Sequence, residues 1–409
     1  MGRSPDPWKA ATRPRAPTDA AGSRRSYGRF MTSSPDTGRP LNVLIAGGGV
    51  AALETLMALH ELAGPRVRTT LLSPTTEFVY APLSVREPFA TGPAARYPLA
   101  RIADDFGAEL HEDALAWVAP GQHAAFTASG AEIDYDVLVL TLGARRERPY
   151  ERVTTFTGGD ESESLHGLVQ DVEGGYVNSV AFVVPPGVTW PLPLYELALM
   201  TAARAREMSV APELTIVTPE EAPLAVFGPE ASADVAQMLD AAGIAIRTSA
   251  YAEVTGGRMV ALHPSGEELT ADRVVAVPTL HGTAPRGVPA DSLGFIPTDG
   301  HGRVPQIHDV YAAGDGVGFP IKQGGIATQQ ADAVAEVIAK RAGAPLEPRA
   351  FRPVMRGLLF TGTEKRFLRG EVSRGRDGVS ETAGSALWWP PSKISGRYLS
   401  AYLEAQPIS

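Results

Sequence analysis

Two glycine-rich turns, far apart in the chain, carry the groups that could do chemistry. In the first turn Gly47 permits a tight bend, Gly49 lets the backbone approach a pyrophosphate, and Ala52 allows a helix to pack closely on a strand. A helix beginning just beyond Gly49 offers unpaired N–H groups and the positive end of its dipole to an anion. The pattern predicts a phosphate-binding turn, and a plain tight turn is the alternative.

The second turn follows another short apolar strand, which ends at Gly314 and Asp315. A glycine-rich loop then carries Lys322 and Gln323, and an amphipathic helix begins near Gly325. A carboxylate at a strand end accepts hydrogen bonds from a polyol, and a helix N-terminus stabilises negative charge on a reduced ring. These two features fit a flavin. We predict Lys322 and Gln323, which would lie beside its ring, as the catalytic residues. A solvated lysine on a loop is the alternative for Lys322.

The composition excludes several other kinds of site. The 409 residues contain no cysteine, which rules out disulfides, thiolate catalysis, cysteine-ligated zinc and iron–sulfur clusters. The formal net charge of -9, without a basic stripe, argues against nucleic-acid binding. The eight histidines are scattered, so no metal site is expected. No uncharged apolar run reaches the roughly 18 residues that a membrane-spanning helix needs.

Parallel strands must position the two turns. Leu41–Ala46 and a helix from Val50 begin a Rossmann βαβ unit, and Val67–Ser73 forms its second strand. A dinucleotide fold normally ends that strand with an acidic residue for a ribose hydroxyl, whereas this chain has Ser73. Tyr135–Leu142 is a further buried strand, whose end lies at the ligand-binding edge of the sheet. Between these strands we expect a helix and a small antiparallel excursion, at Arg96–Phe106, Glu109–Val118, His123–Ala128 and Glu132–Tyr135.

A second βαβ unit begins with the strand Ser179–Val184 and the helix Leu194–Glu207. Its connector, PPGVTWPLP at 185–193, is rich in proline and holds the bulky Trp190. Because each proline lacks an N–H, this connector cannot cradle phosphates as the first turn can. The pattern predicts a dinucleotide-binding fold that has lost its binding loop. The remaining elements of the unit are expected at Leu214–Thr218, Ala231–Ala242, Ile244–Arg247 and near Glu253, Met259 and Val274.

The predicted fold class is α/β, with two Rossmann-like domains of the three-layer ββα type and a small C-terminal α+β segment. That segment holds short strands at Leu358–Thr361 and Arg366–Glu371, followed by an aromatic tail. The first residues are rich in Arg, Pro, Ser and Gly and lack apolar periodicity, which indicates a disordered leader. The expected boundaries are 1–40 for the leader, 41–150 and 301–345 for the first domain, 151–300 for the second, and 346–409 for the C-terminal segment.

Three motifs in register give the chain a family resemblance. GGGVAALE near the start, TLGA at 141–144 and YAAGD at 311–315 resemble the FAD-dependent pyridine nucleotide-disulfide oxidoreductase superfamily. SPTTEFVYAPL, VTPEEAPLAVFGPEAS and FPIKQGGIATQQA are similar to its branch of sulfide:quinone reductase, flavocytochrome c sulfide dehydrogenase and type II NADH dehydrogenase. The resemblance covers nearly all of 41–340.

The resemblance implies FAD, with the pyrophosphate at the first turn, Ser73 near the adenosine ribose, the Ala114 backbone at adenine and Asp315 on the ribityl chain. The cofactor-binding residues predicted in this way are Gly47, Gly49, Val50, Ala51, Ala52, Ser73, Pro82, Ala114, Thr141, Leu142, Gly143, Ala144, Gly314, Asp315, Lys322 and Gly324.

Two departures leave the electron donor open. Sulfide oxidation in that branch uses paired cysteines, which this chain lacks, and NADH oxidation uses a second glycine-rich turn, where this chain has PPGVTWPLP. We therefore expect an FAD-dependent oxidoreductase that passes electrons to a quinone-like or other acceptor. The alternatives are a flavin-bound regulatory or non-catalytic module, and an NAD(P)H-dependent reductase with an atypical second nucleotide site.

The expected partners are small-molecule donors and acceptors, in the cytoplasm or at the inner face of the cell membrane, with a homodimer left open. The tail from Ala386 to Leu403 is expected to lie against the flavin domains. There it would form part of a lipophilic acceptor site or a peripheral membrane contact, with Lys393 facing anionic headgroups. The alternative is that Trp388 and Trp389 cover the domain junction as core or dimer contacts. Glu196 stands where NADH-using relatives carry a helix glutamate, and a helix-surface carboxylate or cap is its plainer interpretation.

Overall fold

The computed structural model describes residues 39–158, 162–371 and 379–406. The predicted leader therefore lies almost wholly outside the described residues. Residues 39–406 of the described chain belong to one compact unit, so the domain boundaries expected from the sequence stay predictions.

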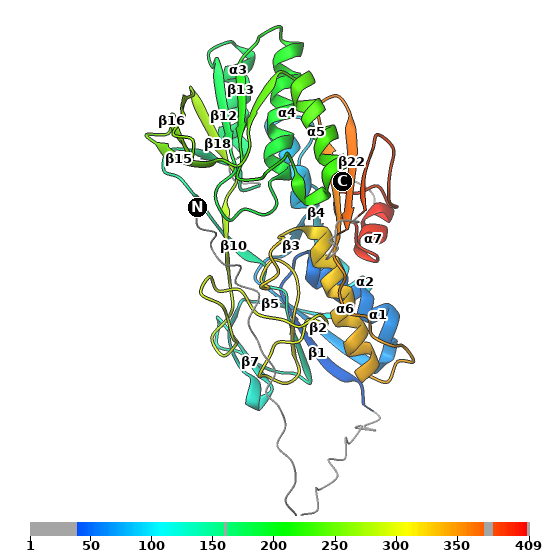
Figure 1. Ribbon diagram of the computed structural model, residues 1–409. Coiled ribbons are helices and arrows are strands. Elements are labelled where there is room, and N and C mark those ends of the chain that lie inside the picture. The colour runs from blue at the N-terminus through cyan, green and yellow to red at the C-terminus, as the bar shows by residue number, and fades with distance from the viewer. Residues whose placement is uncertain (1–38, 159–161, 372–378, 407–409) are drawn as a thin grey trace, which may run out of the picture. The chain divides into compact units, whose positions relative to one another are not determined.

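The first sheet is a five-stranded parallel sheet in the order β20-β9-β1-β2-β5. The apolar, β-branched residues of its central strands are buried on both faces, as parallel strands require. Helices α1 (Val50–Ala63) and α6 (Gly324–Arg341) lie side by side along it (Figure 1). Its strands are β1 (Leu41–Ala46), β2 (Val67–Ser73), β5 (Glu109–Glu112), β9 (Val137–Leu140) and β20 (Val310–Ala312).

An antiparallel meander forms the third layer of the first unit. It has the order β6-β7-β8, and β3 pairs with β4 nearby. The bounds are β3 (Glu77–Val79), η2 (Ala81–Phe89), β4 (Arg96–Pro98), α2 (Leu99–Asp105), β6 (Leu115–Ala119), β7 (Ala124–Thr127) and β8 (Glu132–Asp134).

The second sheet repeats the parallel architecture in the order β11-β18-β12-β13-β14. The antiparallel sheet β15-β16-β17 adds the further layer. The strands of these two sheets are β11 (Thr154–Thr155), β12 (Ser179–Val183), β13 (Glu213–Val217), β14 (Ile244–Arg247), β15 (Tyr251–Thr255), β16 (Met259–His263), β17 (Glu268–Thr270) and β18 (Arg273–Ala276). Its helices are α3 (Ser162–Glu173), α4 (Leu192–Glu207) and α5 (Pro229–Ala241). The α/β class with two Rossmann-like units is thus confirmed.

Two further sheets connect the parts of the chain. The antiparallel pair of β10 (Ala144–Glu147) and β19 (Thr279–Gly282) joins the chain leaving the first unit to the chain returning to it. The C-terminal segment is a sheet of β21 (Val354–Phe360), β22 (Lys365–Glu371) and β23 (Ser380–Ala383), followed by helix α7 (Leu399–Ala405). In Figure 1 α7 lies beside this sheet.

Two expected elements differ in the structure. The helix expected from Arg96 begins only at Leu99, because 96–98 pair with β3 as strand β4. The strand expected over Glu109–Val118 is two strands that belong to different sheets. It breaks at Asp113, whose carboxylate accepts hydrogen bonds from the Ala114 N–H at 2.7 Å and from Ser129. A side chain that bonds the backbone locally competes with strand pairing in this way.

Candidate functional site

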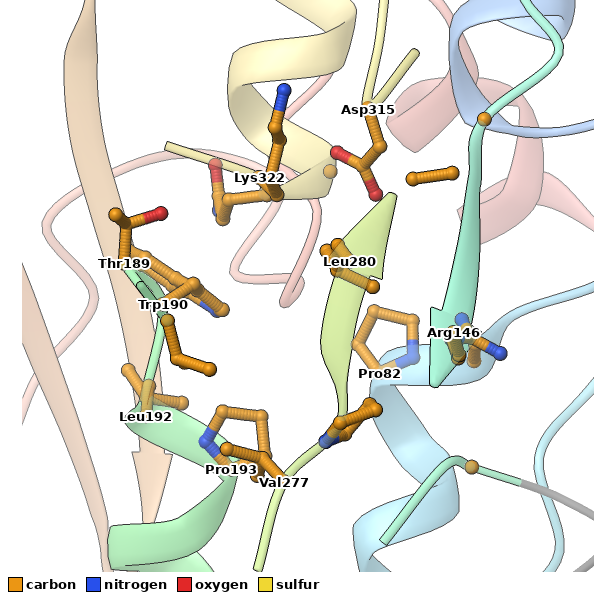
Figure 2. A pocket seen from close by; sticks show the side chains of 18 of the residues that line it. Pro82, Arg146, Thr189, Trp190, Leu192, Pro193, Val277, Leu280, Asp315 and Lys322 are labelled. Carbon is orange, nitrogen blue, oxygen red and sulfur yellow. The ribbon is translucent and has the colours of Figure 1, made fainter. Parts of the chain in front are cut away.

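A cavity of about 640 Å³ lies where the first unit, the second unit and the C-terminal segment meet. The first unit contributes Val50 at the start of α1 and the second predicted turn, the second unit contributes the proline-rich connector, and the C-terminal segment contributes Lys393 and Ile394. In Figure 2, Asp315 and Lys322 lie toward one end, while Trp190, Leu192 and Pro193 form a wall of the other. The cavity has the size and mostly apolar lining of a small-molecule site.

The structure brings together about half of the predicted site residues at this cavity. The predicted residues that line it are Val50, Pro82, Gly143, Ala144, Asp315, Lys322, Gln323 and Gly324. The remaining predicted residues lie outside its lining, in the β1–α1 turn and at the ends of strands of the first sheet: Gly47, Gly49, Ala51, Ala52, Ser73, Ala114, Thr141, Leu142 and Gly314.

The β1–α1 turn has the geometry that a pyrophosphate needs. Gly47 has φ +133°, and a Cβ there would lie 2.2 Å from the Thr141 carbonyl oxygen, so only glycine fits. A Cβ on Gly49 would meet no described atom within 4 Å, which leaves the approach to the turn open. Within the described chain no side chain caps α1. The first N–H groups of α1 and the positive end of its dipole are therefore available to an anion. These residues fit the phosphate part of a dinucleotide.

Asp315 and Lys322 are close enough to influence each other electrostatically. Burial raises the pKa of the Asp315 carboxyl, and the charges of Lys322 and Arg146 act in the opposite direction. Burial lowers the pKa of Lys322 to about 8, while Asp315 and Asp291 oppose the shift. The Lys322 ammonium donates to the Val317 carbonyl and lies 3.8 Å from the centre of the Phe295 ring. Lys322 is therefore held at the cavity, and the solvated-lysine alternative does not apply.

Gln323 holds the start of α6 rather than extending freely into the cavity. Its Oε1 accepts from the Ile326 N–H at 2.8 Å, and its Nε2 donates to the Arg356 carbonyl at 3.1 Å. Both ends of the amide are thus engaged, and the side chain fixes the direction of the helix N-terminus beside Gly324. The geometry assigns Gln323 a positioning role.

The two residues expected near the adenosine have local partners. Ser73 is buried, and its Oγ donates to the Thr75 carbonyl at 3.1 Å and accepts from the Thr75 N–H at 3.2 Å. The Ala114 N–H donates to Asp113 at 2.7 Å, and its carbonyl accepts from the Ala128 N–H at 2.8 Å. Ser73 thus supports the turn from behind, where a Cβ on Gly48 would lie 2.5 Å from its Oγ.

The connector of the second unit is held in place by contacts with other parts of the chain. The Val188 N–H donates to the Pro185 carbonyl at 3.3 Å, and the Thr189 hydroxyl donates to the Pro320 carbonyl of the first unit. Trp190 packs edge-on against Phe227, with ring centroids 5.4 Å apart. The prolines supply no N–H groups, and the Val188 N–H and the Thr189 hydroxyl are engaged in internal contacts, so the connector offers a pyrophosphate few free donors.

The acidic residue that follows the second strand of this unit is also engaged in hydrogen bonds within the chain. Glu220 comes just after β13 and accepts hydrogen bonds from the Tyr195 hydroxyl at 2.7 Å and from Thr218 Oγ1 at 2.9 Å. A dinucleotide fold uses a carboxylate at this place for the ribose hydroxyls. Glu220 was not among the predicted residues, although its position three residues beyond the strand, in VTPE, indicates such a role.

Glu196 and Lys393 correct two expectations from the sequence. Glu196 is fully buried on α4 and pairs with the Lys393 Nζ at 2.5 Å and 2.6 Å, so it is neither a surface carboxylate nor a cap. The Phe360 N–H also donates to it at 2.9 Å. Lys393 therefore lies at the cavity wall instead of facing headgroups. No local pattern indicates this pair, because its members are 197 residues apart.

The aromatic tail lies against both units, as expected. The Ile394 N–H donates to the Tyr80 hydroxyl at 2.8 Å. Trp388 packs against Phe367 of β22 with ring centroids 5.0 Å apart, whereas Trp389 is 80% exposed. Trp389 is therefore not a core residue of this chain, while a dimer contact at Trp389 stays a prediction.

With this geometry established, comparisons with known proteins define the class. The family model described as pyridine nucleotide-disulphide oxidoreductase matches residues 41–332. Sulfide-quinone reductase of Aquifex aeolicus (strain VF5) is 28% identical over 169 residues, which are 39% of this chain and 38% of that protein. The chain therefore belongs to the pyridine nucleotide-disulphide oxidoreductase family, and the match spans less than half the length of the curated relative.

Solved structures share the fold. The sulfide:quinone oxidoreductase of Aquifex aeolicus matches with a TM-score of 0.76 at 19% identity, covering 84% of this chain and 87% of that chain. A ferredoxin reductase from Rhodopseudomonas palustris matches with a TM-score of 0.59 at 23% identity, covering 81% and 82%. The chain is thus similar to the sulfide:quinone reductase branch but contains no cysteine. Among the described residues no helix is long and apolar enough to cross a bilayer.

Proposed function

We propose that this chain binds FAD non-covalently and works as an oxidoreductase whose substrates enter the cavity of about 640 Å³. The observation that carries the proposal is that Val50, the first residue of α1, and Asp315 and Lys322 of the second turn line one continuous cavity. The pyrophosphate would lie at Gly49, the ribityl chain at Asp315, and the ring beside Lys322 and the N-terminus of α6. Family membership supports a flavin here, and the open space at Gly49 supports its phosphates.

Bound FAD would supply the ability to accept an electron pair and pass it on. The chain's own residues would set the electrostatics around the ring. Lys322 and the N-terminus of α6 both present positive charge to the cavity, which favours an anionic reduced state. Gln323 holds that helix end in place through its two hydrogen bonds.

The electron acceptor in this proposal is a quinone-like molecule, and the donor is neither NADH nor a sulfide oxidised through a protein persulfide. A persulfide would need a cysteine, which the chain lacks. The closed connector at 185–193 opposes a nucleotide. The exposed Trp389 beside the tail supports a peripheral contact with the inner face of the cell membrane, since amphipathic aromatic residues are enriched where apolar surface meets water.

The visible spectrum of the purified protein tests the proposal. We expect bound flavin, which is reduced anaerobically by a donor and reoxidised by a quinone. Titration with NADH, NADPH, sulfide and reduced quinols in turn identifies the donor. Lys322→Met should lower the reduction potential of the bound flavin, and Lys340→Met, at an exposed lysine at the far end of α6, is the matched control. A colourless protein that does not take up added FAD would end this proposal.

A further inference from the structure

The cavity extends well beyond the residues that a flavin would contact. Its remaining walls belong to the second unit and the C-terminal segment, and they include Val188, Trp190, Leu192, Pro193, Val277 and Leu358. All six side chains are apolar or aromatic. This compartment, which we define by these six residues, continues from the end that holds Asp315 and Lys322 (Figure 2).

Trp190 is the largest side chain of the compartment, and it is supported from behind. Its ring packs edge-on against Phe227, which is fully buried. Phe227 in turn fits against two glycines of the C-terminal sheet. A Cβ on Gly357 would lie 2.4 Å from the Phe227 ring, and a Cβ on Gly370 would lie 2.8 Å from its Cα. The indole therefore rests on a backing built from two separate parts of the chain.

The charged groups that line the cavity have opposite charges nearby. Lys393 is paired with the buried Glu196, and its Nζ lies 4.5 Å from the centre of the Phe360 ring. Lys322 and Arg146 are both close enough to Asp315 to affect its pKa. A ligand that brought a further charge into the compartment would be desolvated without a dedicated partner, which is costly. The compartment is thus matched to an uncharged molecule.

We propose that the compartment binds a planar, uncharged aromatic molecule, and that Trp190 determines this specificity by stacking against it. The connector that replaced a phosphate-binding turn has become a wall of the substrate site. Aromatic rings bury a large area and add a favourable geometry to stacking, so an indole with a rigid backing is suited to hold a flat ring. The inference rests on the proposed function, in which the flavin would occupy the other end of the cavity.

Calorimetric titration of the flavin-loaded protein with 1,4-naphthoquinone tests this proposal. This probe is flat and uncharged, and the chain has no thiol with which it could react. We expect Trp190→Ala to raise the Kd about tenfold or more, and Trp190→Phe to raise it less than about threefold. Trp389→Ala, at a tryptophan that is 80% exposed, is the matched control and should leave the Kd unchanged.

Val188→Lys provides a second variant that leaves the Trp190–Phe227 contact in place. It puts a charge on the same wall and should also weaken binding of 1,4-naphthoquinone. The proposal is overturned if Trp190→Ala and Val188→Lys bind the probe as the parent protein does, or if Trp389→Ala weakens binding as much as Trp190→Ala. Flavin content, read from the same samples, separates this outcome from failure of the proposed function, in which the protein holds no flavin at all.

Discussion

The two Rossmann-like units have the same architecture but differ in the turn that leads from the first strand of the βαβ unit into its helix. In the first, β1 leads through Gly47 and Gly49 into α1, and the approach to Gly49 is open. In the second, β12 leads through the connector 185–193 into α4. The prolines of this connector supply no N–H groups, and the Thr189 hydroxyl donates a hydrogen bond to the Pro320 carbonyl of the first unit. A parallel sheet with a crossover helix is therefore no evidence of nucleotide binding, because the chemistry lies in the few residues of the turn.

The two units also share a buried glutamate at the same place. Glu54 is the fifth residue of α1 and Glu196 is the fifth residue of α4, and neither is exposed. Both bind the C-terminal segment. Glu54 accepts from the Tyr398 and Leu399 N–H groups at 2.9 Å and 2.8 Å, and Glu196 pairs with Lys393. Helices α1 and α4, unlike the two turns, therefore share a role: each anchors the C-terminal segment, which completes the cavity wall.

The largest effect is expected at the open turn. Gly49→Val should abolish flavin binding while the fold persists, because the new side chain would fill the space for the pyrophosphate without meeting described atoms. Gly49 has φ -94°, which any residue can adopt. Pro186→Ala, in the exposed part of the second connector, is the control and should keep the flavin. Flavin absorbance per protein, with circular dichroism for the fold, measures both, and a yellow Gly49→Val protein would show that the turns do not differ as described.

NADH should be a poor reductant of the bound flavin, because the second unit offers neither an open turn nor a free acidic residue. Glu220 is held by Tyr195 and Thr218. Anaerobic addition of NADH should bleach the flavin over minutes to hours, while photoreduction, the control, bleaches it quickly. If micromolar NADH removes the absorbance within seconds, the second unit binds nucleotide after all.

Asp315→Ala should weaken FAD binding by about 1.5 to 3 kcal/mol, since a hydrogen bond from a polyol to a carboxylate contributes about that much. This corresponds to a Kd raised roughly tenfold to 150-fold. Asp315→Asn, which keeps an acceptor oxygen, should lose less. Fluorescence titration of the flavin-free protein with FAD gives both values. Equal affinity in the alanine variant and the parent would remove Asp315 from the site.

Local patterns were sufficient to predict the turns and most strands. The glycines around residue 48, the prolines of the second connector and the apolar runs are all visible within a dozen residues, and the structure confirms the elements that they indicate. The pattern also predicted that Lys322 would lie at the site, although it could not predict that Gln323 is engaged at both ends of its amide.

Contacts between distant parts of the chain could not be predicted from one sequence. Three contacts join segments far apart in sequence: the Glu196–Lys393 pair, the packing of Gly357 and Gly370 against Phe227, and the hydrogen bond from Thr189 to the Pro320 carbonyl. Tertiary packing alone decides them. Helix α7 was missed for a related reason, since its seven residues are too few for a periodic signal, and Glu54 holds its first N–H groups.

The smallest effect concerns the difference between the two buried glutamates. Glu196 faces a lysine, whereas Glu54 lies close to Asp332 of α6, and burial together with the charge of Glu54 raises the pKa of Asp332 to about 8. Arg397 lowers that pKa and Glu336 raises it. Because this pKa lies above the ordinary aspartate value of 3.8, the folded state holds, between these two pH values, a proton that the unfolded state releases.

Stability should therefore fall as the pH rises from about 4 to about 8, the window between the two pKa values, and level off above it. Asp332→Asn, which removes the ionisable carboxyl, should flatten this dependence and raise the Tm at pH 8.5 by on the order of 3 °C. Asp240→Asn, at an exposed aspartate on α5 of the second unit, is the matched control and should change nothing. Thermal unfolding of the flavin-loaded proteins across this pH range makes the comparison. If the Tm of Asp332→Asn and of the parent changes equally with pH, Asp332 does not hold the extra proton. The two glutamates would then anchor the C-terminal segment with the same dependence on pH.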